Sequence, residues 1–298
     1  MSDKFIKLFY LFEFITGLHF IGAVLIPFYT DWGHTTVTVA QTLQSWFTLC
    51  LFLLEIPTGI VADRYGRKQS IFAGCIVMAA GALLYGSIPN VAIFAVGELT
   101  MALGITLISG ADKALMYEWL NERGRDSEFT SLWARARSWH LAGILVGAPV
   151  GGIIAQRFGL NWPMLLWALP STTGGFLILF IKEPKLHLGS EIESQKKYFQ
   201  TAIQSLRDAA RHPVLFSWTI NAALVAAAGY FVIWLYQPLM KLLAIPYEYY
   251  GFAQAGMVLA EIAIQYSFTY LEKAIPHPRF LFSVFALLAS FGFLVAAL

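Results

Sequence analysis

Long apolar stretches recur along the chain and are separated by short polar segments. About twenty consecutive, mainly apolar residues are enough for a helix that crosses a bilayer. By this criterion the sequence predicts nine spanning helices, at about residues 8–29, 38–62, 69–88, 91–112, 131–156, 162–181, 214–239, 248–271 and 278–298. Glycines and prolines inside these stretches fit the assignment, because transmembrane bundles tolerate them. The predicted fold class is therefore an all-α integral membrane protein.

The composition agrees with a bilayer environment. Hydrophobic residues make up 58% of the chain, charged residues make up 13%, and the mean hydropathy is +0.63. Soluble domains are nearer to about half apolar and about a quarter charged. The net charge of +2 is too small to indicate a nucleic-acid partner. Cys50 and Cys75 lie inside apolar stretches, so we interpret them as small core residues and expect neither a disulfide nor a metal site.

The positions of the basic residues predict the orientation. If the N-terminus is cytoplasmic, every lysine and arginine except Arg157 and Lys241 falls in or near a cytoplasmic segment, as the positive-inside rule requires. Lys4 and Lys7 precede the first apolar stretch, which is long enough to span and lacks the cleavage site of a signal peptide. We expect a multi-pass protein of the cell membrane, of the bacterial inner-membrane type, with a cytoplasmic N-terminus.

A long charged segment at residues 183–213 divides the predicted spans into six and three. Apolar residues recur in it at helical spacing among lysines and arginines, at Ile192, Phe199, Ile203, Leu206 and Ala210. The pattern predicts an amphipathic helix on the cytoplasmic surface, and a solvated linker is the alternative. The expected organisation is a six-helix N-terminal bundle at residues 1–182, this linker, and a partial C-terminal bundle of three helices at residues 214–298.

The most informative polar segment, here called the signature loop, lies between the second and third spans. It reads Gly59-Ile60-Val61-Ala62-Asp63-Arg64-Tyr65-Gly66-Arg67-Lys68. Gly66 can adopt the positive φ that closes a tight turn, and Gly59 would permit the close approach of another helix. Asp63 falls at the end of a helix, where the macrodipole disfavours an anion. A base must compensate it, and the candidates are Arg64, Arg67 and Lys68.

The pattern G-x-x-x-D-R-x-G-R-K resembles the loop between the second and third helices of the major facilitator superfamily of secondary transporters. Six spans, a basic bridge and further spans also resemble the family's layout of two six-helix halves. The resemblance implies a substrate site near the midplane and alternating access by rocking of the halves. It also implies that Asp63 faces the start of an eleventh helix. An ordinary basic loop is the alternative.

The end of the sequence bears on the same resemblance. Residues 293–298 are still apolar, and nine spans would leave the C-terminus outside the cell. We therefore expect a C-terminally truncated member of the family that lacks the last three helices.

A second charged segment, residues 112–119, follows the fourth span. It resembles the family's acid-bearing segment at the cytoplasmic end of helix four, whose carboxylate pairs with the arginine of the signature loop. By position Glu118 fits that role and Arg67 is its expected partner. Asp112 and Lys113 lie deeper in the membrane, and their expected partner is Arg135 or Arg137. Together they would form a charged gate, and simple snorkelling to the interface is the alternative.

The fifth span carries small residues at regular intervals. They are Gly143, Gly147, Pro149, Gly151 and Gly152. Such spacing lets helices touch backbone to backbone, and the proline adds a kink. The run resembles the antiporter motif G-x-x-x-G-P-x-x-G-G, but Pro149 comes one residue late. A packing motif without a role in antiport therefore remains the alternative.

Ionisable residues inside predicted spans are candidate functional groups, because a charge is costly in the bilayer. They are Glu13, His19, Glu55, Glu98, His140 and Glu261. Each is either a hydrogen-bonded structural residue or a proton carrier, and His140 would titrate near neutral pH. Candidate cavity residues of the seventh and eighth spans, with core packing as the alternative, are Asn221, Tyr230, Trp234, Gln237 and Gln265.

The sequence contains no zinc-binding HExxH, phosphate-binding GxxxxGK[ST] or nucleophile GxSxG motif. We therefore predict no enzyme activity, no cofactor and no metal. The predicted function is secondary transport, with proton-coupled efflux of a small organic compound as the first interpretation. Symport of a sugar or another metabolite is the second, and a membrane enzyme or receptor is the third. The expected partners are the lipid bilayer, a small-molecule substrate and the proton, and the protein is expected to be a monomer.

Overall fold

The computed structural model describes residues 2–183, 204 and 211–274, which are helical and contain no strand. The α-helices are α1 (Ser2–Thr16), α2 (Leu25–Pro27), α3 (Val37–Tyr65), α4 (Arg67–Tyr85), α5 (Val91–Ile108), α6 (Ala111–Asn121), α7 (Phe129–Phe158), α8 (Trp162–Leu166), α9 (Ala168–Leu179), α11 (Pro213–Leu242) and α12 (Tyr247–Ala274). Short 3-10 or π-helical turns are η1 (Gly22–Val24), η2 (Phe28–Trp32) and η3 (Asp126–Glu128).

Five helical segments of the described chain are long and apolar enough to cross a membrane. They are Val37–Tyr65, Arg67–Tyr85, Val91–Asn121, Asp126–Phe158 and Trp162–Leu179. The prediction of an all-α membrane protein is confirmed. The expected linker helix and the ninth predicted span fall outside the described residues, so the number of spans stays a prediction.

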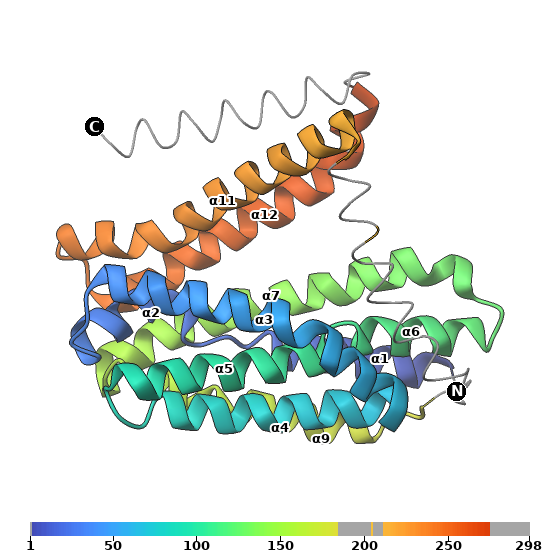
Figure 1. Ribbon diagram of the computed structural model, residues 1–298, viewed down its shortest axis with the longest axis horizontal. Coiled ribbons are helices and arrows are strands. Elements are labelled where there is room, and N and C mark those ends of the chain that lie inside the picture. The colour runs from blue at the N-terminus through green and yellow to red at the C-terminus, as the bar shows by residue number, and fades with distance from the viewer. Residues whose placement is uncertain (1, 184–203, 205–210, 275–298) are drawn as a thin grey trace.

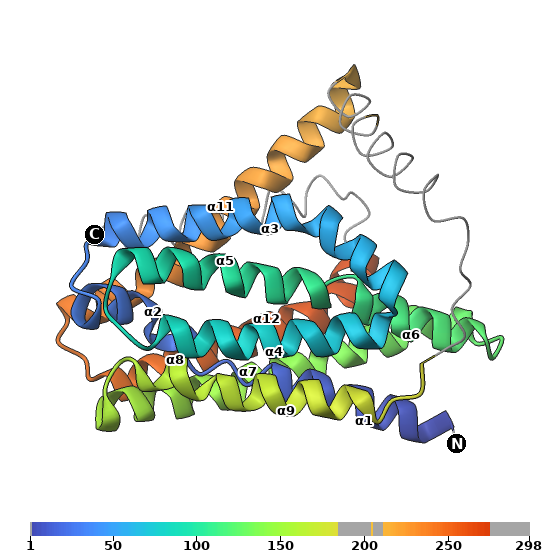
Figure 2. The same cartoon turned by 60° about the horizontal axis from the view of Figure 1, so that its bottom comes forward.

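The helices form an elongated bundle with two distinct ends (Figure 1). The signature loop and the N-terminus lie at one end, called here the loop end. The turn η2 and the start of α12 lie at the opposite end, called here the far end. α12 packs along α7, whereas the first half of α11 points away from the bundle (Figure 2). The second half of α11 therefore meets the other helices only near the far end.

The first predicted span is not one helix, and here the sequence-based expectation was wrong. α1 ends at Thr16, and a non-helical stretch at residues 17–21 precedes η1 and α2. The break lies directly against α7, because a Cβ added to Gly17 would collide with the backbone of His140. Gln237 of α11 satisfies two backbone groups beyond the break: its amide donates to Gly22 O (2.9 Å) and accepts from Ile26 N (2.8 Å). Irregular backbone at membrane depth is tolerated when it is buried in protein in this way.

The fourth predicted span continues beyond its expected end at residue 112. α5 stops at Ile108, Gly110 adopts a positive φ of +78°, and α6 runs on to Asn121. A positive φ is unfavourable for most residues but open to glycine, so Gly110 permits the interruption. As a result Asp112 begins a helix inside the bundle and does not lie in a loop.

Local sequence signals explain the helix ends next to the site. Thr36 caps α3 by accepting from Val39 N (3.3 Å), and Asn90 caps α5 by accepting from Ala92 N (2.8 Å). Gly66 separates α3 from α4 with a φ of +104°. The buried apolar residues form one cluster around Phe28, Tyr85 and Phe94 and a second cluster around Phe9, Ile71 and Leu115.

Candidate functional site

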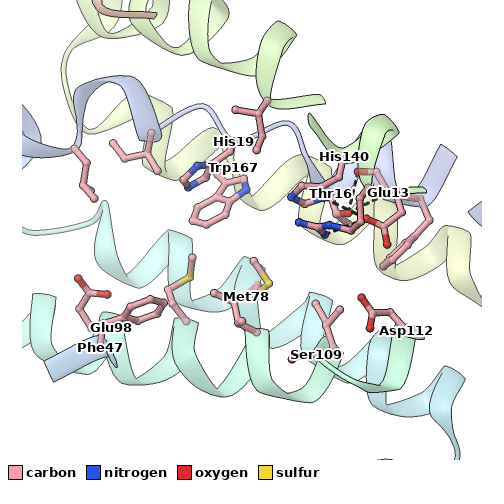
Figure 3. A pocket seen from close by; sticks show the side chains of 18 of the residues that line it. Glu13, Thr16, His19, Phe47, Met78, Glu98, Ser109, Asp112, His140 and Trp167 are labelled. Carbon is pink, nitrogen blue, oxygen red and sulfur yellow. Dashed lines mark hydrogen bonds and ion pairs between the residues drawn. The ribbon is translucent and has the colours of Figure 1, made fainter. Parts of the chain in front are cut away.

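A cavity of about 590 Å³ lies inside the bundle (Figure 3). Helices α1 to α8 and the break in the first span contribute to its wall, and α11 adds Trp234. Most of the lining side chains are aliphatic, aromatic or methionine, and its polar groups gather at two ends. We call these the Glu98 end and the Glu13 end after the acid at each.

At the Glu98 end, a carboxylate is surrounded by neutral donors. Glu98 of α5 is 3% exposed and accepts hydrogen bonds from Tyr85 Oη (2.7 Å) and Gln44 Nε2 (2.7 Å). Tyr29 of η2 also donates to Glu98 and contacts Tyr85, and Gln44 donates to Tyr29 Oη (3.0 Å). These four residues come from four different predicted spans, so that the cluster exists only in the folded bundle.

At the Glu13 end, the acid has basic partners. Glu13 of α1 is 2% exposed, and its Oε2 lies 3.7 Å from Arg137 Nη1 and 3.4 Å from His140 Nδ1. The His140 contact has ion-pair distance without hydrogen-bond geometry. Asp112 lies across the cavity from Glu13 (Figure 3).

Within the described residues, Asp112 and Lys113 form no ion pair at contact distance with Arg135 or Arg137, although Asp112 and Arg137 line the same cavity. Arg137 pairs with Glu13, and Arg135 is exposed and forms no ion pair within the described residues. Asp112 Oδ1 instead accepts from the backbone N of Lys113 (2.6 Å), at the start of α6. The break at Gly110 explains the difference, because it places Asp112 in the cavity wall.

His19 lies in the break of the first span, between the two polar ends. Its ring packs on Trp167 with centroids 4.2 Å apart, and both residues line the cavity. The neighbouring backbone rests on the small residues of α7. A Cβ on Gly147 would come within 2.8 Å of His19 N, and one on Gly143 within 2.8 Å of Gly17 C.

The rest of the α7 motif extends this contact. A Cβ on Gly151 would collide with the carbonyl of Phe20, and one on Gly152 would lie 2.8 Å from Tyr247 O of α12. Pro149 lies inside α7, next to Gly251 of α12. The motif therefore faces the broken segment on one side and α12 on the other, as a backbone-to-backbone packing surface does.

In the signature loop, Arg67 is the base that contacts both acids. It forms an ion pair with Asp63, and its Nε lies 3.3 Å from Glu118 Oε1. Arg64 instead lies over the ring of Tyr65, 5.5 Å from its centroid. The close helix approach expected at Gly59 is wrong for the described residues, since a Cβ there would meet none of their atoms within 4 Å.

Sequence reasoning missed Glu183, at the end of the sixth predicted span. Its Oε1 accepts from the backbone N of Lys68 (3.1 Å), and Lys68 Nζ donates to Leu179 O (3.3 Å). A carboxylate is favourable at the first turn of α4 because of the helix dipole. Its proximity to Lys68 depends on the packing of α4 against α9, and the sequence contains no signal for it.

At the far end, sequence reasoning missed the contacts of Asp31 and Lys241, and it expected Gln237 at the cavity, which Gln237 does not line. Asp31 of η2 forms an ion pair with Lys241 of α11 and accepts from Tyr247 Oη (2.6 Å). Gln237 is fully buried and binds the first segment as described above. The isolated Lys241 near the end of an apolar helix is the signal that could have indicated the contact with Asp31.

The remaining candidate residues are not brought to the cavity. Asn221 and Glu261 lie exposed on α11 and α12. The side chains of Tyr230 and Gln265 lie outside the described part of the structure. Among the described residues, no group of three or more His, Cys, Asp or Glu side chains is arranged to hold a metal ion.

Comparisons with known proteins place this architecture in a family. A multidrug resistance protein, Stp of Mycobacterium tuberculosis, is 24% identical over 134 residues, which are 45% of this chain and 23% of that protein. Protein ZINC INDUCED FACILITATOR 1 of Arabidopsis thaliana is 33% identical over 119 residues, 37% of this chain and 23% of that protein. A transporter of Rickettsia bellii is 22% identical over 184 residues, 61% of this chain and 44% of that protein.

The matched segments thus span less than half the length of each of these relatives. The family model extends much further along this chain: the model of the Major Facilitator Superfamily matches residues 8–298. Together with the helical bundle and the signature loop, this match shows that the chain belongs to the Major Facilitator Superfamily.

Proposed function

We propose that this chain acts in secondary transport and exports a small organic compound in exchange for protons. The observation that carries the proposal is the cavity of about 590 Å³, which has an apolar wall and carboxylates at both ends. Ligand sites commonly have this size and lining, and ionisable groups inside a membrane protein mark substrate and proton paths. The name of the Mycobacterium tuberculosis relative, a multidrug resistance protein, supports efflux.

The proposed cycle alternates access between the two ends of the bundle. Support comes from the far end, where Asp31, Lys241 and Gln237 connect the first segment to α11. At the loop end, Arg67 connects α3 to α6 through Asp63 and Glu118. We assign gating roles to both groups of contacts, because charged pairs of this kind can break and re-form when helices rock.

The proton-coupling candidates follow from the two cavity ends. Glu13 and His140 form one candidate pair, whose protonation would weaken the contact of Glu13 with Arg137. Glu98 is the other candidate, because it lies in an environment of neutral donors. We further propose a monomer in the cell membrane with a cytoplasmic N-terminus. The proposed organisation keeps the six-helix unit at residues 1–182, the linker at 183–213 and the helices from 214 onward.

Reconstitution tests this function directly. The full chain in proteoliposomes should move ethidium against its gradient when a pH gradient is imposed, and an uncoupler should abolish the movement. Uptake together with protons would favour symport, and no proton dependence would contradict coupling. The variant Asp63→Asn should slow transport without loss of folded protein. Asp126→Asn, an exposed acid in η3, is the matched control and should transport at the rate of the unmodified chain.

A further inference from the structure

We propose that the Glu98 end of the cavity binds an amphipathic organic cation that carries an aromatic group. The proposal rests on the transport function argued above and specifies the charge and chemical class of the substrate. Four observations support it: the partners of Glu98, the contrast with Glu13, the wall of the cavity and the positions of its basic residues.

Glu98 has hydrogen bonds but no counter-charge. Within the described residues no basic side chain lies in ion-pair range of its carboxylate, whereas Tyr29, Tyr85 and Gln44 all donate to Oε1. No described donor contacts Oε2. A buried charge without a partner of opposite sign is unfavourable. The carboxylate therefore needs either a proton or a cation from outside the protein.

Glu13 provides the contrast within the same cavity. Its carboxylate lies within 4 Å of both Arg137 and His140, so that its charge is compensated by the protein. Lys113 also lines the cavity, together with Asp112 at the start of α6. The lysine and arginine of the wall are thus found on α6 and α7, and His19 lies in the break of the first span, whereas Glu98 lies with Phe47 at the opposite side of the view in Figure 3.

The wall next to Glu98 suits an aromatic or alkylated cation. The aromatic residues Phe47, Tyr85 and Trp167 line the cavity, together with Met78 and Met101. Aromatic rings attract cations through their quadrupole, and methionine adapts to ligands of different shape. Among the described residues that line this end, an anion would find no donor with a positive charge, so the arrangement discriminates by charge.

Binding of two ions with the same shape and opposite charge tests the proposal. The full chain, purified in detergent, is titrated with tetraphenylphosphonium and with tetraphenylborate in a calorimeter. The phosphonium should bind at least about tenfold more tightly than the borate, since a charge pair in a partly desolvated site is strongly favoured. Its affinity should fall as the pH is lowered, because protonation removes the charge of Glu98.

Two variants locate the site. Glu98→Gln keeps the shape of the side chain and should weaken phosphonium binding by at least about tenfold. Glu128→Gln, at a partly exposed acid that pairs with Arg125 outside the cavity, should bind as the unmodified chain does. If Glu98→Gln binds the phosphonium normally, the assignment is overturned. If that variant does not fold, the comparison of the two ions in the unmodified chain decides: equal affinity, or binding of neither ion, overturns the proposal.

A parallel transport assay separates this inference from the proposed function. Phosphonium binding that depends on Glu98, without proton-driven transport by the unmodified chain, would support the cation site and contradict the function. Proton-driven transport of a neutral dye without any preference for cations would support the function and contradict the cation site.

Discussion

Replacing Gly147 by valine should destabilise the protein by disturbing the contact between α7 and the broken first segment. A Cβ at this position would lie 2.8 Å from His19 N, 3.0 Å from Leu18 C and 3.1 Å from Leu18 Cα. Ordinary van der Waals contact begins at about 3.4 Å, so one backbone must move by about half an ångström. All three neighbours are backbone atoms, and no side-chain rotation can relieve the contact.

The expected cost follows from the energetics of overpacking. Forcing extra atoms into a packed interior costs about 1–3 kcal/mol, and valine recovers only about 0.5 kcal/mol of this through its better helix propensity relative to glycine. The net destabilisation of about 0.5–2.5 kcal/mol corresponds to a melting temperature lower by about 1–10 °C, taking about 2–4 °C per kcal/mol. The shift also displaces His19, which lines the cavity, so the affinity for the transported compound should fall.

The chain carries a suitable reporter for the melting experiment. Cys50 and Cys75 are free and buried, with 2% and 1% exposure, and a thiol-reactive fluorescent dye will label them only when the protein unfolds. The control is Gly256→Val on α12, where a Cβ meets no described atom within 4 Å and where the change in stability should stay within about 0.5 kcal/mol. A Gly147→Val protein that melts at the same temperature as Gly256→Val would refute the steric argument.

Three further outcomes follow from the two ends of the bundle. Arg67 Nε lies 3.3 Å from Glu118 Oε1, so Arg67→Glu should slow transport. Adding Glu118→Arg to that variant should restore part of the transport rate. Absence of any recovery would exclude a functional pair of Arg67 and Glu118. Partial burial acts to raise the pKa of Asp31, but hydrogen bonds, foremost from Lys241, hold this pKa below its ordinary value of 3.8. The stabilisation from Asp31 is therefore present above about pH 4 and lost as the pH falls through the lowered pKa. Asp31→Asn should accordingly lower the melting temperature at pH 7 and have a smaller effect on it below pH 4. An equal effect at the two pH values would contradict this reasoning. Gln237→Leu should lower the melting temperature by an amount equivalent to about 1–3 kcal/mol of stability, since two buried backbone groups lose their hydrogen-bond partner. An unchanged melting temperature would show that these two groups find another partner.

Hydropathy predicted most of the helices well. The bounds expected for the second span, 38–62, and the fifth, 131–156, agree with α3 and α7 to within a few residues. A spanning helix needs apolar residues along its whole length, so this signal is a sum over about twenty positions and survives local exceptions. The charged pattern of the signature loop was equally readable, because its residues are neighbours in sequence.

The breaks in the first and fourth spans were not readable in this way. Residues 17–21 are compatible with a helix by composition. They are not helical because α7 presents backbone there and because Gln237, 215 residues from Gly22, satisfies the freed carbonyl. At Gly110 a single positive φ interrupts an apolar segment. Both features depend on contacts or on a backbone state that a hydropathy pattern does not encode.

The cavity shows the same division between sequence and structure. The sequence by itself determined that the chain is a helical membrane protein with a facilitator-type loop and with acids at membrane depth, because these properties depend on composition and on adjacent residues. Only the tertiary structure decided that Glu13 has Arg137 and His140 as partners while Glu98 has tyrosines and a glutamine. Helices distant in sequence supply these partners, and the charge balance of a buried carboxylate depends on which side chains the packing brings within a few ångströms of it.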